Sequence, residues 1–327
     1  MSPRLSLALS EGALSLPETG RIAVFGASPD ADLSALPRAR CQIVTPLRPA
    51  YDHWRAQGYE CGTDPAGPFA CSIVFLPRAK AAARAVIAQA MALTSGPVLI
   101  DGAKTDGIDS LLKEVRKRLP VSGSLSKAHG KLFWLPADPA AFSDWVARPS
   151  QIDGFTTLPG VFSADGVDPA SALLASALPA RLGAHVADLG AGWGYLSSAI
   201  LSRGDLAALH LVEADEVALR CARLNVTDPR ARFHWADARH WQPPEPLDTV
   251  VMNPPFHTGR SGDPGLGQAF ITSASAMLKP SGQLWMVANR HLPYEDTLAQ
   301  SFREITEPSG DSRFKLIHAA RPTRRRA

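Results

Sequence analysis

The segment His185-Val-Ala-Asp-Leu-Gly-Ala-Gly-Trp-Gly-Tyr195 opens the most informative part of the chain. An apolar strand in this segment ends near an acid, Asp188, and glycines follow at positions 190, 192 and 194. A helix-like run from Tyr195 to Leu201 comes next. A strand, a glycine-rich turn and a helix in this order are typical of a nucleotide site in an open α/β sheet. The segment therefore predicts such a site at the end of its strand.

The spacing of the glycines indicates which nucleotide is bound. A dinucleotide fingerprint reads G-x-G-x-x-G, whereas Gly190, Gly192 and Gly194 follow G-x-G-x-G and Tyr195 stands where the third glycine would fall. The carboxylate of Asp188 would repel a phosphate, but it suits S-adenosylmethionine, which carries an ammonium and a sulfonium and no phosphate. We therefore predict that Asp188 and the three glycines bind S-adenosylmethionine. The alternative is a glycine-rich turn that binds nothing.

The composition of the chain predicts a reduced globular protein with two domains. The 327 residues are 45% hydrophobic and 20% charged, which is ordinary for this class. The four cysteines form no C-x-x-C pair, so we expect neither a disulfide framework nor a metal site. We find no signal peptide pattern and no apolar run long enough to span a bilayer. A cytoplasmic protein without membrane contact is expected.

Charge is distributed unevenly along the chain. Residues 1–150 contain 17 basic and 13 acidic side chains, whereas residues 151–320 contain 13 basic and 18 acidic ones. The end of the chain, from Arg321 to Arg326, adds four arginines. A polyanionic partner would therefore be held mainly by the first half and this tail. The alternative for the tail is a solvated, disordered end.

The first half alternates apolar strands with helical stretches. Strands are predicted at 21–25, 42–45, 71–76 and 97–100, and helices at 79–92 and 108–119. This βαβ rhythm predicts a parallel sheet. The turn after the first strand has one glycine, Gly26, and no acid precedes it. We interpret this half as a methyltransferase-like sheet that no longer binds cofactor. The boundary is predicted near 145–152, which gives domains 1–148 and 149–327.

Acids at the ends of later strands extend the predicted cofactor site. Glu213 ends the strand 207–212, 25 residues after Asp188, where it can accept hydrogen bonds from ribose hydroxyls. Asp237 follows the strand 232–235, where it could recognise the adenine amino group, although an acid there is also common turn chemistry. Asp168 before Pro169 predicts the start of a helix that ends at Leu178. The preceding loop either folds over a ligand or is a plain connector.

The segment Asp248-Thr-Val-Val-Met-Asn-Pro-Pro-Phe-His257 predicts the catalytic residues. Its strand delivers Asn253 to the carboxyl edge of the sheet, where open α/β sheets bind ligands. The Asn253 side-chain oxygen and the Pro254 carbonyl can each accept an N–H from a planar amino group, which directs the nitrogen lone pair at a methyl group. Phe256 offers a face for stacking of the base. Turn chemistry alone is the alternative reading of this segment.

These segments together resemble the small-subunit ribosomal RNA methyltransferase C family. The resemblance rests on Leu158-Pro-Gly-Val-Phe-Ser163 with Asp165-Gly-x-Asp168, Asp188-Leu-Gly-x-Gly-x-Gly194, Asn253-Pro-Pro-Phe-His257 with Gly259, Val287-Ala-Asn-x-x-Leu-Pro-Tyr294 and Arg313-Phe-Lys315. It covers the second half in order, and the first half more weakly, through 98–100 and 104–119. Trp193 departs from the family, which frequently has a small residue at this position.

The resemblance implies two tandem Rossmann-like class I methyltransferase domains, the first degenerate and supporting RNA binding. In the second domain it implies strand order 3-2-1-4-5-7-6 and methylation of guanine N2 in 16S ribosomal RNA with S-adenosylmethionine. We expect Phe162, Phe256, His257 and Tyr294 to contact this substrate. For Tyr294 the alternative is a packing residue at a helix start, and His257 could simply sit in its loop.

Other functions share parts of these motifs. Asn-Pro-Pro-Phe/Tyr also serves enzymes that methylate adenine N6 in DNA or glutamine in release factors, and guanine N2 of 23S ribosomal RNA is a further target. A non-catalytic RNA-binding assembly factor is the alternative from a different class. The acids Asp188 and Glu213 together with Asn253 argue against this last reading.

Overall fold

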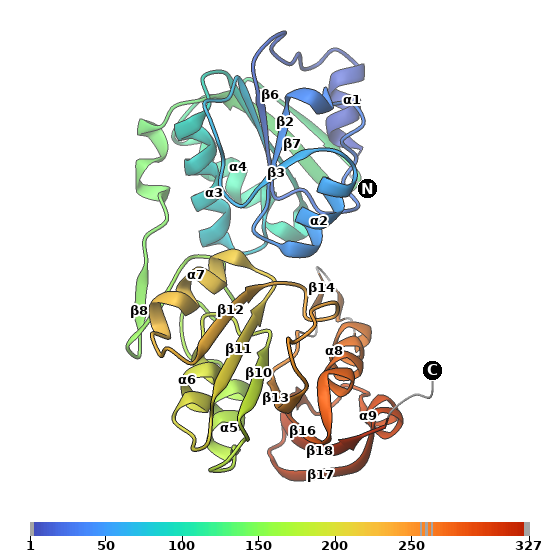
Figure 1. The fold of residues 1–327 in the computed structure, drawn as a ribbon. Coiled ribbons are helices and arrows are strands. Elements are labelled where there is room, and N and C mark those ends of the chain that lie inside the picture. The colour runs from blue at the N-terminus through green and yellow to red at the C-terminus, as the bar shows by residue number, and fades with distance from the viewer. Residues whose placement is uncertain (1–2, 256, 259–260, 263, 324–327) are drawn as a thin grey trace. The chain divides into compact units, whose positions relative to one another are not determined.

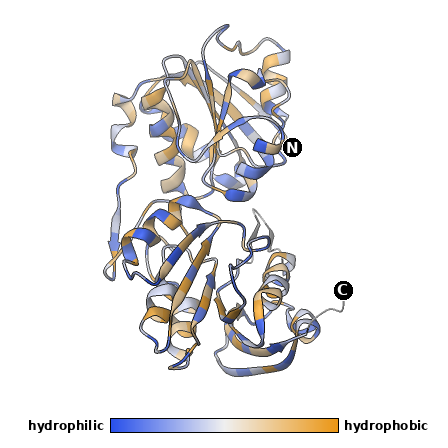
Figure 2. Cartoon of the chain, in the orientation of Figure 1, coloured by the Kyte–Doolittle hydropathy of each residue, from blue (hydrophilic) through white to orange (hydrophobic). Residues whose placement is uncertain are grey.

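The computed structural model describes residues 3–255, 257–258, 261–262 and 264–323. The chain divides into two compact units, Met1–Pro149 and Ser150–Ala327, each built on its own seven-stranded sheet (Figure 1). The inner strands of both sheets are mainly hydrophobic in Figure 2, as expected for strands that helices cover on both faces.

The sheet of the first unit has the strand order β3-β2-β1-β4-β5-β7-β6. Its strands are β1 (Ile22–Phe25), β2 (Cys41–Val44), β3 (Glu60–Gly62), β4 (Cys71–Phe75), β5 (Pro97–Ala103), β6 (Gly123–Lys127) and β7 (Gly130–Pro136). The predicted parallel sheet is confirmed for β3 to β5, but β7 runs antiparallel to both β5 and β6. The reversal follows from the turn at Ala128 and His129, whose positive φ angles join β6 to β7 as a two-residue hairpin.

Helices cover both faces of this sheet. They are α1 (Arg4–Ser10), α2 (Arg48–Ala56), α3 (Lys80–Leu93) and α4 (Ile108–Arg116), with 3-10 turns η1 (Arg38–Arg40), η2 (Lys104–Asp106) and η3 (Ala140–Trp145). Ile87 of α3 and Leu111 of α4 pack on one face, whereas Leu5 of α1 and Trp54 of α2 belong to the core of the other. The predicted helices at 79–92 and 108–119 correspond to α3 and α4, and the second of them ends earlier than predicted.

The sheet of the second unit has the strand order β12-β11-β10-β13-β16-β18-β17. Its strands are β10 (His185–Leu189), β11 (Ala208–Glu213), β12 (Ala231–Trp235), β13 (Leu247–Met252), β16 (Leu278–Asn289), β17 (Phe302–Gly310) and β18 (Phe314–Pro322). Numbered within the unit, this order is 3-2-1-4-5-7-6, so the expected methyltransferase topology is confirmed. The first five strands are parallel, and β18 pairs antiparallel with β16 and β17.

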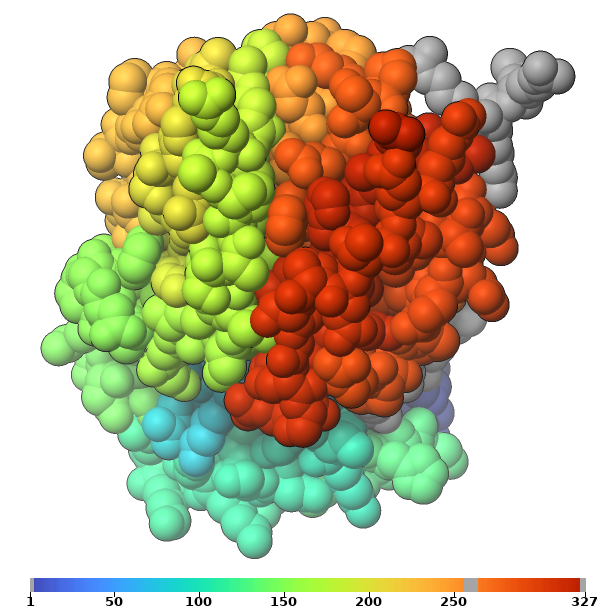
Figure 3. Space-filling model, turned by 90° about the horizontal axis from the view of Figure 1, so that it is seen from below, coloured from blue at the N-terminus to red at the C-terminus, as the bar shows by residue number. Residues whose placement is uncertain are grey.

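Alternating side chains of β10 separate the two faces of this sheet. Ala187 and Leu189 lie in the cluster with α8 (Pro264–Met277) and α9 (Glu295–Ser301). Val186 points to the opposite face, whose helices are α5 (Pro169–Ala177), α6 (Tyr195–Leu201) and α7 (Glu216–Asn225). Because side chains alternate along a strand, Asp188 also faces this second layer. In the space-filling view, the segment that contains α5 lies beside the C-terminal strands (Figure 3).

Acidic side chains begin two helices of the second unit. Asp168 accepts the Ser171 N–H at 2.8 Å and Pro169 is the first helical residue, so the predicted start of α5 is confirmed. Asp215 caps α7 by accepting the Val217 N–H. Small hairpins complete the described elements: β8 (Ser150–Ile152) with β9 (Phe155–Thr157), and β14 (His257–Thr258) with β15 (Ser261–Gly262).

The described residues contain neither a membrane-spanning helix nor a metal-binding cluster. None of the helices within these ranges is long and apolar enough to cross a membrane. The same ranges hold no group of three or more His, Cys, Asp or Glu side chains arranged to bind a metal ion.

Candidate active site

The glycine turn between β10 and α6 forms one wall of the candidate site. Gly190, Gly192 and Gly194 have φ angles of 76°, 55° and 94°, a region that other residues rarely adopt. A side chain added at Gly192 would meet no atom within 4 Å, and one at Gly190 only Phe270, at 3.7 Å. The backbone at Gly190 and Gly192 therefore faces open space that a ligand can approach closely.

Asp188 lies beneath this turn and is completely buried. Its Oδ2 accepts a hydrogen bond from the Ser197 hydroxyl at 2.7 Å, whereas Oδ1 has no partner among the described residues. Burial, together with the nearby charge of Glu213, raises the pKa of Asp188 to about 7, against the lowering effect of the hydrogen bond from Ser197. A buried acceptor without a donor is costly, and a nearby positive charge would favour its ionised form.

Glu213, at the end of β11, connects that strand to the glycine turn. Its Oε2 accepts the Gly192 N–H and its Oε1 accepts the Asp215 N–H, each at 2.8 Å. Burial raises the pKa of Glu213, although these two backbone donors act in the opposite direction. Each carboxylate oxygen can accept a second hydrogen bond, so the side chain retains capacity for a hydroxyl ligand.

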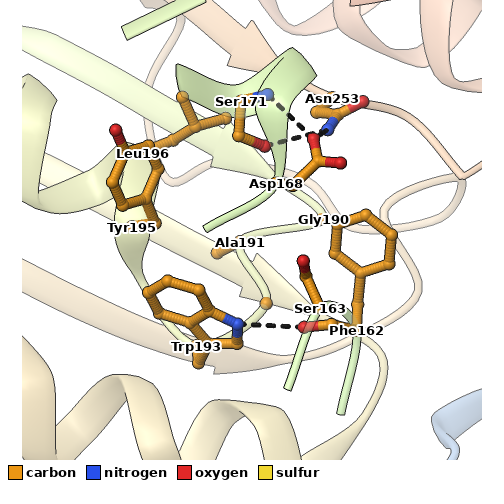
Figure 4. Close-up of a pocket in the computed structure, with 11 residues that line it drawn as sticks. Phe162, Ser163, Asp168, Ser171, Gly190, Ala191, Trp193, Tyr195, Leu196 and Asn253 are labelled. Carbon is orange, nitrogen blue, oxygen red and sulfur yellow. Dashed lines mark hydrogen bonds between the residues drawn. The ribbon is translucent and has the colours of Figure 1, made fainter. Parts of the chain in front are cut away.

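A pocket lies where the glycine turn, the start of α5 and the end of β13 meet (Figure 4). It is lined by Phe162, Ser163, Asp168, Ser171, Gly190, Ala191, Gly192, Trp193, Tyr195, Leu196 and Asn253. The structure thus brings Asn253, Gly190, Gly192 and Phe162 of the predicted residues together around one space. Glu213 holds the turn through the Gly192 N–H and Asp188 bonds to Ser197 of α6, and neither acid is in this lining.

Asn253 is the polar side chain that β13 delivers to the pocket. Its Nδ2 donates to Asp168 Oδ2 at 2.8 Å and to Ser171 Oγ at 2.9 Å. The Asn253 oxygen points away from Asp168 in Figure 4. Pro254, which follows, is buried. Phe256 and the side chain of His257 lie outside the described residues.

The loop before α5 is attached to the glycine turn through Trp193. The indole Nε1 donates to the Phe162 carbonyl at 2.9 Å, and the Trp193 side chain is only 4% exposed. Phe155 and Tyr195 pack against the indole, with ring centroids 5.1 and 5.8 Å away. Phe162 itself keeps 59% of its surface exposed beside the pocket.

Two predicted residues lie elsewhere. The carboxylate of Asp237 is paired with Arg239, whose Nε lies 2.9 Å from Oδ1. Burial acts to raise the pKa of Asp237, but the hydrogen bonds from Arg239 hold it below its usual value. Tyr294 is completely buried where α9 begins, and its hydroxyl fills the space that a side chain at Gly267 would occupy. This burial favours the packing of Tyr294 at a helix start over its predicted contact with substrate.

Several residues of the pocket were not predicted as site residues from the sequence. Asp168 was expected only as a helix cap, Trp193 only as a departure from the family, and Ser171 and Tyr195 not as site residues. The sequence did offer one signal for Ser171. Its hydroxyl follows the cap Asp168 by three residues, so both side chains lie near the same helix end. Asn225 at the end of α7 also supports the turn, because its Nδ2 donates to the Trp193 carbonyl at 2.8 Å.

The first unit has the same turn without these groups. Gly26 N–H donates to the Val44 carbonyl at 3.0 Å, as Gly190 N–H does to Val212 at 2.8 Å. The strand registers place Val24 where the second unit has Asp188. The residues after Gly26 are Ala, Ser and Pro, so the run of glycines is missing. The first unit thus keeps the fold and lacks the residues that form the site.

Comparisons with known proteins agree with this geometry. The family model of the methyltransferase small domain matches residues 153–318. The ribosomal RNA small subunit methyltransferase C of Shewanella sp. strain MR-4 is 31% identical over 75% of both chains. The chain belongs to the ribosomal RNA small subunit methyltransferase C family. The Hahella chejuensis relative of the same name is 29% identical over 67% of this chain and 68% of its own length.

A solved structure extends the family likeness over both units. It is the T. thermophilus 16S rRNA N2 G1207 methyltransferase in complex with AdoMet and guanosine, with a TM-score of 0.76 and 27% identity. The match covers 94% of this chain and 90% of the T. thermophilus chain. Tandem methyltransferase-like domains, the first degenerate, are thus confirmed.

The residues of the second unit fit S-adenosylmethionine. The open backbone at Gly190 and Gly192 accepts a closely approaching ligand, and the acids Asp188 and Glu213 favour a cation rather than a phosphate. The buried acceptor atom Asp188 Oδ1, which no described residue supplies with a donor, is consistent with a positively charged ligand nearby.

Proposed function

We propose that this protein is an S-adenosylmethionine-dependent methyltransferase that transfers a methyl group to the exocyclic N2 of a guanine in 16S ribosomal RNA. The observation that carries the proposal is Asn253, whose amide nitrogen is held at the pocket wall and whose oxygen is left to accept. The relatives' names specify small-subunit ribosomal RNA, and the T. thermophilus relative was solved with guanosine.

The chemistry required is activation of a poor nucleophile. The lone pair of guanine N2 is delocalised into the ring, so it attacks a methyl group weakly. Hydrogen bonds from the amino group to the Asn253 oxygen and the Pro254 carbonyl favour a pyramidal nitrogen and direct its lone pair. When bound, S-adenosylmethionine supplies the electrophilic methyl group on its sulfonium. Once methylated, the nitrogen is cationic and acidic, so it loses its proton to solvent water and needs no base from the chain.

We assign the predicted residues to this reaction as follows. Asn253, Pro254 and Phe256 act on the target base, and Phe162 and His257 contribute to substrate binding. Asp188, Gly190, Gly192, Gly194, Glu213 and Asp237 bind or support the cofactor. Among these, the positions of Gly190, Gly192, Phe162 and Asn253 in one pocket lend the most support.

Mass analysis of the methylated nucleoside tests the proposed reaction. The full chain is incubated with labelled S-adenosylmethionine and with small-subunit or large-subunit ribosomal RNA from an unmethylated source. We expect N2-methylguanosine in 16S RNA with the wild type and little product with Asn253→Ala. Label in adenosine, in 23S RNA or in a glutamine side chain would contradict the assignment. Binding of RNA with no methyl transfer would favour the assembly-factor alternative.

We propose further that the two units divide the labour of binding. The first half and the arginine-rich end hold the surplus positive charge, whereas residues 151–320 are net acidic. Contacts with phosphates supply much of nucleic-acid affinity and weaken with salt. Residues 150–327 alone should bind cofactor normally and RNA weakly, with a shallower salt dependence than the full chain. Equal RNA affinity and equal slopes would contradict this division.

Ribosomal RNA as substrate also favours a cytoplasmic location.

A further inference from the structure

The side-chain amide of Asn253 is held in one orientation by its neighbours. Nδ2 lies 2.8 Å from Asp168 Oδ2 and 2.9 Å from Ser171 Oγ. An ionised carboxylate accepts hydrogen bonds and donates none, so the amide must present its NH₂ group to Asp168. The opposite rotation would place two acceptor oxygens against each other. The Asn253 oxygen is therefore the atom left to receive an N–H (Figure 4).

Asp168 is itself held firmly by the helix that it caps. The same oxygen, Oδ2, accepts the Ser171 N–H at 2.8 Å, and Pro169 fixes the first helical residue. Ala170 and Leu174 bury the inner side of α5 in the core of the second unit. The carboxylate therefore has little freedom to follow a rotating amide.

We propose that Asp168, assisted by Ser171, is the positioning residue that orients Asn253 for methyl transfer. The proposal rests on the function proposed above. A hydrogen bond from the amide NH₂ to a carboxylate fixes the orientation, and it also shifts electron density toward the amide oxygen. Both effects strengthen that oxygen as an acceptor while positive charge develops on the guanine nitrogen.

A capping function alone does not account for this arrangement. Asp215 begins α7 through the Val217 N–H in the same way. Asp168 additionally joins the end of β13, 85 residues further along the chain, at the pocket itself. Its distinctive role is thus the link between the start of α5 and Asn253.

A double-mutant cycle on the full chain separates positioning from capping. The rate is measured under single turnover, as transfer of labelled methyl from S-adenosylmethionine to unmethylated 16S ribosomal RNA. Asp168→Ala should lower the rate about tenfold, which corresponds to about 1.4 kcal/mol in the barrier. In an Asn253→Ala background the same change should lower the rate less than twofold, because Asp168 acts through Asn253. The affinity for S-adenosylmethionine, measured by calorimetry, should change less than threefold.

Two further variants distinguish a loss of positioning from a defect in folding. Asp168→Asn keeps an oxygen that can cap α5 but has a flippable amide, so it should fold normally and show a smaller loss than Asp168→Ala. Asp248→Asn is the matched control: this carboxylate accepts the His185 N–H and pairs with Lys279 at the other end of β13. It should retain the wild-type rate.

The outcomes are distinguishable. If the two losses in rate multiply in the Asp168→Ala, Asn253→Ala double variant, the two residues act independently and the positioning role is overturned. A loss in affinity for S-adenosylmethionine without a loss in rate would overturn it as well. If Asp168→Ala fails to fold, equal losses from Asp168→Asn in the wild-type and Asn253→Ala backgrounds would overturn it instead. Absence of guanine methylation by the wild type itself would overturn the proposed function, not the coupling of these two residues.

Discussion

Replacing Trp193 with phenylalanine removes one hydrogen bond from the loop beside the pocket and keeps an aromatic ring. The indole N–H donates to the Phe162 carbonyl at 2.9 Å, and the ring is nearly buried between Phe155 and Tyr195. The loop that carries Phe162 and Ser163 contributes to the pocket lining. Loosening this loop should therefore weaken cofactor binding more than it changes the fold.

The magnitude follows from the single bond that is lost. A hydrogen bond between uncharged groups contributes about 1 kcal/mol net. Because Phe162 is largely exposed, we expect water to replace the indole at its carbonyl, so no buried acceptor is left unpaired. A loss of about 1 kcal/mol should raise the dissociation constant for S-adenosylmethionine roughly fivefold. Trp193→Ala would also leave a cavity that costs about 3–5 kcal/mol of folding stability.

Calorimetric titration of the full chain with S-adenosylmethionine measures this effect. Trp54→Phe is the matched control, because the Trp54 Nε1 donates to the Ala27 carbonyl at 3.0 Å and its side chain is equally buried in the first unit. The control should bind cofactor like the wild type. If Trp193→Phe binds cofactor as tightly as the control does, and both unfold at similar temperatures, the hydrogen bond serves stability alone and the anchoring argument is refuted.

Three other predictions concern the second unit. Asn253→Ala should lower the single-turnover rate by roughly 10²–10³, or about 2–4 kcal/mol, with cofactor affinity nearly unchanged; a rate within a few-fold of wild type would exclude Asn253 as the acceptor. Titration should give one S-adenosylmethionine site per chain, and Asp188→Ala should abolish it; two sites would contradict the degenerate first unit. Burial lowers the pKa of His210 to about 4 and also lowers that of His234. Because these histidines take up protons at a higher pH in the unfolded chain, the free energy of unfolding should fall as pH drops from about 6.5 toward 4. Denaturant unfolding at pH 7 and pH 5 should differ by on the order of 1–2 kcal/mol through His210, and His210→Phe should remove most of that difference.

Strands and helices with strong local signals were predictable from the sequence. The pair Asp168–Pro169 marks a helix start through backbone chemistry that acts within one turn, and the structure confirms it. β7 was not predicted despite its apolar residues. β3 and β6 were missed because the first has three residues and the second, Gly-Ser-Leu-Ser-Lys, has no hydrophobic run. Edge strands such as these bury little surface, so their sequences carry a weak periodic signal.

The carboxyl edge of the sheet was predictable, but the contacts across it were not. Asn253 follows a strand, and parallel strands end at the same edge, which is sufficient to place it near the glycine turn. Its bond to Asp168 depends on how α5 packs on the sheet, which no local pattern encodes. The burial of Tyr294 similarly depends on Gly267 of α8, which leaves room for the hydroxyl. Aromatic residues in a shared motif can thus be core residues.

The two units show how the residues of a binding site affect the stability of the sheet that carries them. In the second unit the strand positions before and beside the turn hold Asp188 and Glu213, and burial raises the pKa of both acids. In the first unit the corresponding positions hold Val24 and Thr45, both buried, and Val24 packs in an apolar cluster. An apolar strand end stabilises the sheet without a ligand, whereas buried acids need a cationic partner to offset their desolvation. Loss of the cofactor would therefore remove the reason to keep the acids, and the first unit retains only the part of the turn that the sheet itself requires.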